Sequence, residues 1–431
     1  MKIPKKTKKT TTKSDEAPKK SKSKVKDENL TPAQAFVKSI QANQHYKGVV
    51  QIQMASEAKT TYLLRRPTGI LTMDIALGGG LHAGGTAEVF GAESVGKTHL
   101  SLRVAGEVQR IYGPKTAILI FTIEARIDKG YMRKSGVCIA YSNDEIREFE
   151  IIRMSRGLPA FTSEETDDLK MQIGDIVVLS ASTSDMGLDA IVEGIKQDVF
   201  QLIILESLGA FLSKEVDGGW VGDQHYAGAS RIVTQFQNQV YPLLVMDQEV
   251  GEGESMIYRP RETTIIGVNQ ARASMDGGPK GPKIHAASGA YAWKHGQLVS
   301  IQLSKGKSIP ENERPHIGRT VNWKLHKGKA GTHDGKYGTY DYYHMERDDP
   351  TFWKKASENF YGVDVIGNAI EAGIENGVIT QAAAWLEWNG LRANGREKFT
   401  PMIQEAFEDP AVYQKFYDSV LAAANILVRY Q

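Results

Sequence analysis

The stretch Gly91-Ala92-Glu93-Ser94-Val95-Gly96-Lys97-Thr98 follows the apolar run 87–90 and precedes a segment with helical periodicity. A glycine-rich turn between a strand and a helix aims successive backbone N–H groups at a polyphosphate, and the helix dipole adds positive potential. Lys97 is placed to reach the β- and γ-phosphates, and the Thr98 hydroxyl is placed to coordinate Mg²⁺. The stretch therefore predicts a phosphate loop that binds a nucleoside triphosphate with Mg²⁺. The alternative is a chance match, which arises in roughly one or two per cent of chains this long.

The segments around the phosphate loop predict an α/β fold with a mostly parallel central sheet. Near-continuous apolar runs are typical of strands that are buried on both faces. Helix-length amphipathic segments, such as 188–199 and 227–240, lie between several of these runs, as right-handed crossover connections require. The runs are 117–121, 176–179, 202–205, 264–268 and 298–301.

The composition favours a globular protein of the cytoplasm. The chain has 431 residues, of which 41% are hydrophobic, so it can bury a large core. No run approaches the ~18 consecutive apolar residues of a membrane helix, and the start of the chain has no apolar signal core. The single cysteine, Cys138, excludes an intramolecular disulfide and a cysteine-based metal site, and its expected role is packing.

Charge is distributed unevenly along the chain. Residues 1–26 hold 11 Lys and two acidic residues, whereas the formal charge of the whole chain is only +2. Such a tail cannot bury enough apolar surface to fold, so we expect residues 1–28 to be disordered. A solubilising tail and an accessory nucleic-acid arm are equal alternatives for its role.

Composition and periodicity divide the rest of the chain into three parts. Residues 29–65 form a small segment with one helix and an extended piece, residues 66–348 form the α/β core, and residues 349–431 form a small α-rich domain. Within the core, the charged segment 138–174 interrupts the alternation of strands and helices and is interpreted as an insertion. In the last part, Thr400-Pro401 predicts the start of a helix.

Polar residues follow three of the predicted strands, at the point where each strand ends. They are Glu124, Glu206-Ser207 and Asn269-Gln270. Ligands of such sheets bind beyond the carboxyl ends of the strands, so these residues are expected to face the phosphate loop. Taken singly, each could simply begin a loop; together with the phosphate loop they predict one site.

Several separated motifs resemble the RecA family of homologous-recombination ATPases, over nearly the whole chain from about residue 30. The resemblance implies a RecA-like P-loop ATPase core, an oligomerisation segment at 29–65 and a carboxy-terminal domain at 349–431. The matching segments, in the order of the family, are 68–78, 123–137, 215–227, 269–272 and 377–390.

The resemblance implies roles for residues around the nucleotide. Glu124 would polarise the attacking water, as expected of a carboxylate near the γ-phosphate in ATP hydrolysis. Asp128 and Tyr131 would hold adenine by hydrogen bonding and stacking, although Tyr131 could instead serve core packing. Glu206 stands at the Walker B position, where it would join Thr98 in holding Mg²⁺. The family usually has aspartate there, so the longer side chain is a departure.

The resemblance also implies two DNA-binding loops. The first covers 215–227 and the helix that leaves it, with Tyr226 and Arg231 as DNA contacts. The second begins after Gln270, which would sense the γ-phosphate, and runs to about residue 289. Glycines and lysines make this segment locally basic, so it can track phosphates, and an apolar side chain can wedge between unstacked bases; an ordinary mobile surface loop is the alternative. Its candidate DNA contacts are Arg272, Met275, Lys280 and Lys283.

Two lysines complete the implied site. Lys327 and Lys329 match the pair that reaches across a subunit interface to the neighbour's ATP. Cations supplied by a neighbour would stabilise transition-state charge and make hydrolysis depend on assembly. A solvated lysine pair is the alternative.

The implied function is a DNA-dependent ATPase that forms a helical homo-oligomeric filament on single-stranded DNA. It would pair that strand with homologous duplex DNA and catalyse strand exchange, with ATP and Mg²⁺ and without a membrane. A ring helicase or regulatory ATPase with the same core is one alternative. A filament scaffold that binds nucleotide without turnover is another.

The chain also departs from the common bacterial form of the family. The insertion 138–174, an extended loop at 247–262 and the Lys-rich tail are additional, and an acidic carboxyl tail is missing. These differences predict a divergent, phage-like member.

Overall fold

The computed structural model describes residues 30–47, 50–56, 64–123, 128–211, 228–250, 257–274, 283–286, 291–309, 318–329, 332, 334–344 and 361–427. The chain divides into two compact units, Met1–Lys59 and Thr60–Gln431. The expected disordered tail, residues 1–28, lies outside the described residues.

The first unit contains the predicted helix, α1 (Pro32–Ala42). Its start follows from local sequence, because Thr31 and Gln34 form a reciprocal capping box and proline occupies the first turn. Val37 is buried, whereas the Phe36 side chain is 58% exposed. After the helix, residues 50–54 carry apolar side chains at alternate positions, as a strand would, and residues 55–56 form a turn.

The second unit is built on a ten-stranded sheet. The six strands from β11 to β5 are parallel neighbours, which confirms the predicted mostly parallel core. Three further strands extend the sheet in antiparallel fashion. In order across the sheet, the strands are β14 (Tyr361–Val363), β13 (Tyr337–His344), β12 (Gly318–Gly328), β11 (Val299–Ile309), β3 (Thr86–Gly91), β9 (Thr264–Ser274), β6 (Leu202–Glu206), β4 (Ala117–Thr122) and β5 (Asp175–Leu179), and β10 (Lys283–Ala286) pairs with β9.

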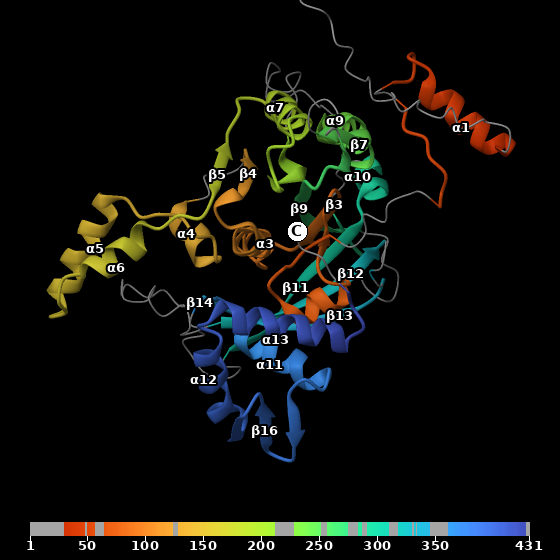
Figure 1. The fold of residues 1–431 in the computed structure, drawn as a ribbon. Helices are drawn as coiled ribbons and strands as arrows, with labels where there is room; N and C mark the ends of the chain where they lie inside the picture. Colours follow the sequence, from red (N-terminus) through yellow and green to blue (C-terminus); the bar gives the residue numbers. More distant parts are fainter. Residues whose placement is uncertain are drawn as a thin grey trace, which may run out of the picture. The chain divides into compact units, whose positions relative to one another are not determined.

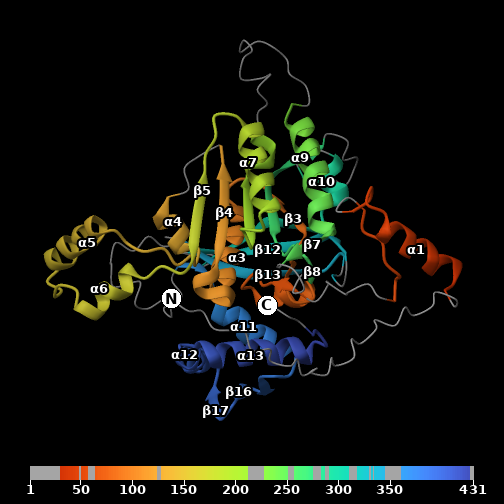
Figure 2. The ribbon, with the colours of Figure 1, turned by 45° about the horizontal axis from the view of Figure 1, so that its top comes forward.

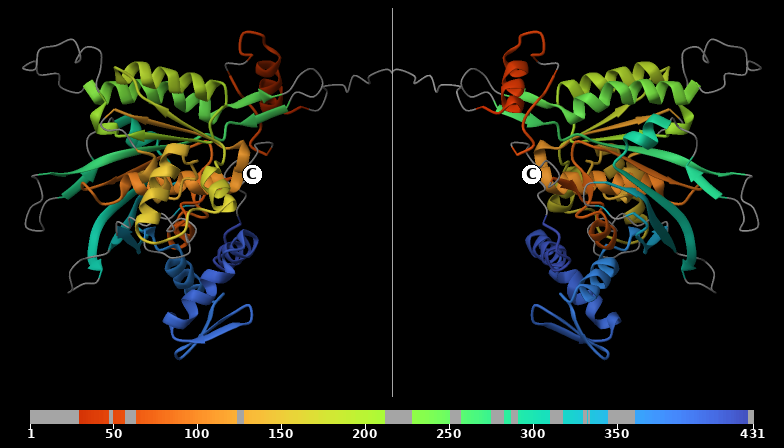
Figure 3. Two further views of the ribbon diagram at one scale, coloured as in Figure 1. Left: turned by 90° about the vertical axis from the view of Figure 1, so that its left-hand side faces the viewer. Right: turned by 90° about the vertical axis from the view of Figure 1, so that its right-hand side faces the viewer.

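Helices cover both faces of this sheet, which is why its central strands are mostly apolar. Along β4, Ile118 and Ile120 belong to one core cluster, whereas Leu119 and Phe121 belong to the other, as the alternation of side chains requires. Figures 1 to 3 show the two groups of helices on opposite sides of the strands. One face carries α2 (Leu71–Ala76), α3 (Lys97–Tyr112) and α4 (Lys129–Lys134), and the other carries α7 (Ser184–Lys196), α9 (Gly228–Val245) and α10 (Tyr291–Gly296).

The segment interpreted as an insertion folds into two helices, α5 (Asn143–Ser155) and α6 (Ser163–Lys170). Each begins with a capping box, formed by Ser142 and Glu145 in one and by Thr162 and Glu165 in the other. Arg133 of α4 ties the segment to the core. Its guanidinium donates to Glu145 at 2.8 Å and lies 3.3 Å from the centre of the Tyr141 ring. The segment is therefore anchored on α4.

Smaller elements connect these layers. In the segment 247–262, which was predicted to be an extended loop, β7 (Asp247–Val250) pairs antiparallel with β8 (Ile257–Pro260), and the residues between these strands lie outside the described ones. Before the phosphate loop, β1 (Arg65–Arg66) pairs with β2 (Leu81–His82). The helices of the second unit that are described are each too short or too polar to cross a membrane.

The last part of the chain packs as a mixed α/β cap with its own core. It contains α11 (Val365–Glu375), α12 (Arg396–Ala406) and α13 (Pro410–Ala423), as the α-rich prediction requires. It also contains a three-stranded antiparallel sheet of β15 (Thr380–Ala382), β16 (Trp385–Trp388) and β17 (Leu391–Asn394), which the sequence did not predict. The prediction of a helix start at Thr400-Pro401 was wrong. Helix α12 begins at Arg396 and contains Pro401 in its second turn, where only one backbone bond is lost.

A buried carboxyl group joins this cap to the core. Asp74 of α2 is fully buried and accepts hydrogen bonds from the Thr68 backbone and hydroxyl, at 2.7 and 2.8 Å, and from the Tyr417 hydroxyl of α13, at 2.6 Å. Burial raises the pKa of Asp74 to about 7, and the hydrogen bonds oppose that rise. The folded protein therefore binds this proton more tightly than the unfolded chain does.

We expect the free energy of unfolding to fall as the pH rises from about 5 to 8, by on the order of 2 kcal/mol from this group alone. The stabilisation is complete at low pH and is lost as the pH rises through the raised pKa. Chemical unfolding of Asp74→Asn should lack this component. An equal pH dependence in the variant and the wild type would contradict the assignment.

Candidate functional site

The phosphate loop has the backbone that its sequence predicts. It connects β3 to α3, and Gly96 adopts a left-handed conformation with a φ of 97° immediately before the helix. Gly91 lies against β11 so closely that a Cβ there would overlap the carbonyl oxygen of Leu303. Side chains at these two positions would therefore strain the loop or push it away from the sheet. The Lys97 ammonium folds back over the loop and donates to the carbonyl oxygens of Gly91 and Ala92, at 3.2 and 2.8 Å.

The side chains of Thr98 and Glu206 are in contact, as their predicted shared role requires. The Thr98 hydroxyl, in the first turn of α3, donates to Glu206 Oε1 at 3.0 Å. Glu206 ends β6, two strands away from β3, so the longer side chain still reaches the threonine. A hydroxyl and a carboxylate beside a phosphate loop are hard oxygen ligands of the type that Mg²⁺ takes together with phosphate oxygens. These residues fit a Mg²⁺–nucleotide complex.

The candidate base contacts lie on α4. The Asp128 carboxyl caps this helix, because its Oδ1 accepts the Tyr131 N–H at 2.8 Å. Tyr131 is half-buried, and burial raises the pKa of its phenol above the ordinary value, so the ring stays neutral. The segment 124–127, which contains the candidate catalytic Glu124, lies outside the described residues.

His99 holds Tyr131 against the phosphate-loop helix. The rings of Tyr131 and Tyr342 meet the His99 ring edge-to-face, at 6.4 and 4.7 Å between centroids. The Ser135 hydroxyl donates to the Tyr131 carbonyl at 2.9 Å, so it accepts from His99 Nδ1, also at 2.9 Å. Burial lowers the pKa of His99 to about 3, so the imidazole is neutral. Sequence reasoning missed His99, whose place beside Thr98 was its only signal.

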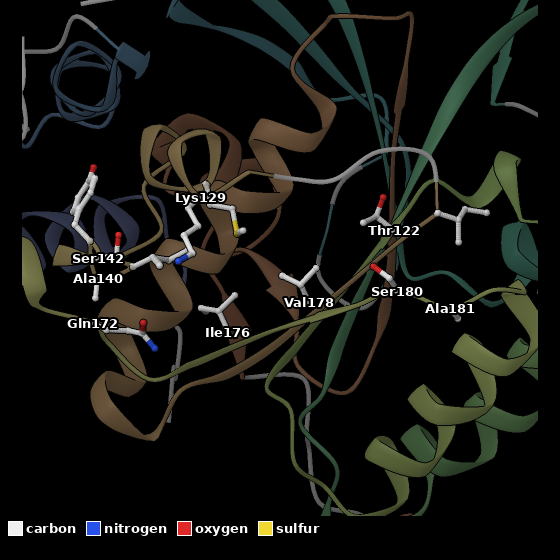
Figure 4. A pocket seen from close by; sticks show the side chains of 13 residues that line it. Thr122, Lys129, Ala140, Ser142, Gln172, Ile176, Val178, Ser180 and Ala181 are labelled. Carbon is white, nitrogen blue, oxygen red and sulfur yellow. The ribbon is translucent and has the colours of Figure 1, made fainter. Parts of the chain in front are cut away.

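A hollow of about 860 Å³ lies beside α4 (Figure 4). Lys129 of α4, the end of β4 and one side of β5 line it, and the insertion supplies Ala140 and Ser142. The phosphate loop does not contribute to its walls. The hollow therefore flanks the candidate base-binding helix rather than the phosphate site.

Strand β9 brings the candidate γ-phosphate sensor to the phosphate loop, and it continues to Ser274, so the prediction that Asn269 and Gln270 follow the end of a strand was wrong. Gln270 pairs with Gly91 in the β3–β9 register and is exposed. The preceding Asn269 is fully buried, its Oδ1 accepting the Gln270 N–H at 3.0 Å and its amide nitrogen donating to Glu88 at 2.9 Å. Sequence reasoning also missed Glu88; the signal was one carboxylate inside an otherwise apolar strand.

Most of the candidate DNA contacts lie outside the described residues. That holds for the segment 212–227, which includes Tyr226, and for 275–282, which includes Met275 and Lys280. Arg231 is exposed on α9. Arg272 and Lys283 lie on β9 and β10, which pair antiparallel, so both ends of the expected loop are regular strand.

Both candidate interface lysines contact the end of α10. The Lys327 ammonium donates to the carbonyl oxygens of Lys294 and His295, the latter at 3.1 Å, and the Lys329 ammonium donates to that of His295 at 3.4 Å. Carbonyl groups at a helix C-terminus attract cations. The two lysines thus occupy defined positions at one end of the sheet.

Comparison with known proteins agrees with this geometry. The model of the RecA N-terminal domain matches residues 34–143, which include the phosphate loop and α4. Protein RecA of Thioalkalivibrio sulfidiphilus is 24% identical over 386 residues, which cover 88% of this chain and 90% of that protein. Protein RecA of Geobacter sulfurreducens is 24% identical over 79% of this chain and 80% of its own length. The chain is thus similar to RecA proteins along most of its length.

The similarity extends well beyond the phosphate loop. Protein RecA of Fusobacterium nucleatum is 26% identical over 77% of this chain and 70% of its own length. This chain has a glutamate at the end of β6 and carries two helices anchored on α4.

Proposed function

We propose that this protein is a DNA-dependent ATPase that polymerises on single-stranded DNA and catalyses homologous pairing and strand exchange. The observation that carries the proposal is that three parts of the site lie together beside the carboxyl ends of strands β3 and β6. These are the phosphate loop, the Thr98–Glu206 pair at 3.0 Å, and Gln270 beside Gly91 at the start of the second DNA-loop candidate.

ATP is the proposed substrate. Backbone N–H groups of the loop and the Lys97 ammonium would hold its phosphates, and Tyr131 would contact its base. Glu124 would orient the attacking water, since positioning and charge stabilisation account for most of the catalysis in phosphoryl transfer. The Lys97 ammonium would exchange its present bonds to loop carbonyl oxygens for phosphate oxygens.

Mg²⁺ is the proposed cofactor, with Thr98 and Glu206 as the residues that would hold it. When bound, the ion supplies charge neutralisation at the phosphate oxygens. The Thr98 hydroxyl already points at the Glu206 carboxylate, so the two side chains converge on the same position.

ATP would act as a switch between two DNA affinities. A ligand shifts an equilibrium by its differential affinity for the two states. Gln270 would report the γ-phosphate to the segment that follows it, and Lys327 and Lys329 would contact the nucleotide of a neighbouring copy. DNA affinity would therefore be high with ATP and low after hydrolysis.

The closest alternative is a ring helicase or regulatory ATPase with the same core. Hydrolysis of ATP, measured with and without single-stranded DNA, separates a DNA-dependent enzyme from a regulator. We expect strong stimulation by DNA. Equal rates with and without DNA would contradict the proposal and would favour a regulator with another partner. Steady phosphate release would exclude a scaffold without turnover.

We place the subunit contact of the filament at the open edge of the sheet. Strand β5 is the last strand of the sheet, and its Val177 and Val178 side chains are 42% and 46% exposed. Residues 50–54, with apolar side chains at alternate positions, could add as a strand to the β5 of a neighbouring copy. This assignment accounts for apolar side chains in both units.

Replacing Ile52 with glutamate is therefore expected to prevent filament formation. Ile52→Glu would place a charge among the apolar side chains on one side of an added strand, where it would be costly to bury, whereas Gln53→Glu places the same charge on the other side, where the side chain is already polar. Electron microscopy with ATP and single-stranded DNA should show filaments for Gln53→Glu and short oligomers or monomers for Ile52→Glu. Long filaments of Ile52→Glu would contradict this contact.

The departures from the common bacterial form support a divergent, phage-like member. A protein that acts on DNA inside a bacterial cell, including a phage-infected one, would work in the cytoplasm.

A further inference from the structure

Four polar side chains lie in a row across neighbouring strands of the sheet. They belong to β9, β3, β11 and β12, which are adjacent in that order. Glu88 pairs in register with Ser300, and Ser300 pairs in register with Lys327. Register partners point to the same face, so these side chains share one side of the sheet.

Glu88 is the centre of this row. Its Oε1 accepts the Asn269 amide N–H at 2.9 Å, and its Oε2 accepts the Ser300 hydroxyl at 3.1 Å. Glu88 is 1% exposed, Asn269 is 0% exposed and Ser300 is 4% exposed. Burying a carboxylate is costly unless its oxygens are hydrogen-bonded. The bonds from Asn269 and Ser300 therefore hold Glu88 in one position.

Each end of this row of side chains lies at a residue of the proposed site: Asn269 lies next to Gln270, and the last member of the row is Lys327. Asn269 immediately precedes Gln270 and accepts its backbone N–H. At the other end, burial and the charge of Lys329 lower the pKa of Lys327, while the charges of Asp334 and Glu88 oppose this. Glu88 therefore acts on Asn269 by hydrogen bonding and on Lys327 by charge, through the sheet that carries the phosphate loop.

We propose that Glu88 is a positioning residue. It holds the γ-phosphate sensor, Gln270, and the interface lysine, Lys327, in fixed positions relative to each other. The inference rests on the proposed function, in which Gln270 senses ATP and Lys327 reaches a neighbour's nucleotide. Through Asn269, Glu88 fixes the position of Gln270, at the point where the pairing of β9 with β3 ends. Loss of that fixed point uncouples nucleotide binding from DNA affinity.

The test uses the direction of the hydrogen bond that the Asn269 amide donates to Glu88. Asn269→Asp replaces the donor of the bond to Glu88 with a second carboxylate, so two buried acids face each other. The double variant Glu88→Gln/Asn269→Asp reverses the polarity, because the amide introduced at position 88 can donate to the carboxylate introduced at position 269. The double variant also keeps one negative charge in the row.

The measurement is the affinity for a labelled oligo(dT) strand with a slowly hydrolysed ATP analogue, divided by the affinity with ADP. We expect Asn269→Asp to lower this ratio by about tenfold or more, and the double variant to recover it to within about threefold of the wild type. Affinity for a fluorescent ATP analogue should change by less than about threefold in both variants.

Thr264→Val is the matched control. Thr264 also lies buried on β9, at its other end, and donates to the His82 carbonyl at 2.9 Å. Its loss should lower the melting temperature without changing the affinity ratio. A purely structural role for Glu88 predicts instead that the ratio, the nucleotide affinity and the melting temperature fall together.

Two results would overturn the inference. One is an Asn269→Asp variant with the wild-type ratio, and the other is a double variant that is no better than Asn269→Asp. If the wild type itself binds oligo(dT) equally with both nucleotides, the proposed function fails, and this inference fails with it.

Discussion

Replacing Lys97 with alanine is expected to lower kcat/KM for ATP hydrolysis by about 10³-fold or more and to abolish ATP-dependent strand exchange. A single preorganised donor to developing negative charge contributes about 10²–10³-fold, and Lys97 would also bind the ground-state phosphates. Its ammonium already lies over the loop, bonded to the Gly91 and Ala92 carbonyl oxygens. Steady-state phosphate release measures the effect.

Lys115→Ala serves as the control for this variant. Lys115 is exposed beyond the far end of α3, so its loss removes one positive charge at a distance from the phosphate loop. Activity of Lys97→Ala within about tenfold of the control would remove the phosphate loop from the mechanism.

Replacing Glu124 with glutamine is expected to produce the second largest effect, a fall in kcat of about 10²–10⁴-fold. The amide keeps the size of the side chain but cannot accept a proton from water. Because ATP still binds, the variant should stay in its high-affinity state on single-stranded DNA. Rapid-quench hydrolysis and DNA dissociation, measured on the same sample, check both halves of this expectation.

The control here is Glu148→Gln, an exposed carboxylate on α5. Normal turnover in Glu124→Gln would show that another group activates water. Slow turnover together with fast DNA release would show that hydrolysis and DNA affinity are not linked, which contradicts the ATP switch.

Much of the core could be predicted because its signals are local. The apolar runs that became β4, β6 and β9 are each bounded by polar residues and are buried, as predicted. The run that became β5 was wrongly predicted to be buried on both faces, because β5 is the last strand of the sheet and its valines are exposed. The antiparallel extension could not be predicted in this way. Strands β12 and β13 alternate apolar with charged or polar residues and resemble surface segments until β12 pairs with β11 and β13 pairs with β12.

The candidate site shows the same division. Lys97 and Thr98 follow from spacing alone, and Glu206 from its place after a strand. Glu88 and His99 could not be found from sequence, because their roles come from partners far along the chain: Asn269 and Ser300 for Glu88, and Tyr342 for His99. Buried polar residues acquire meaning only from the tertiary contacts that satisfy them.

Joint-molecule formation tests the central claim most directly. Single-stranded DNA coated with the protein would be mixed, in ATP and Mg²⁺, with supercoiled duplex that is either homologous or unrelated. The account predicts joint molecules with homologous duplex only, and none with Lys97→Ala. Stimulation of ATP hydrolysis by single-stranded DNA without any joint molecules would contradict it, and would identify a DNA motor built on the same core.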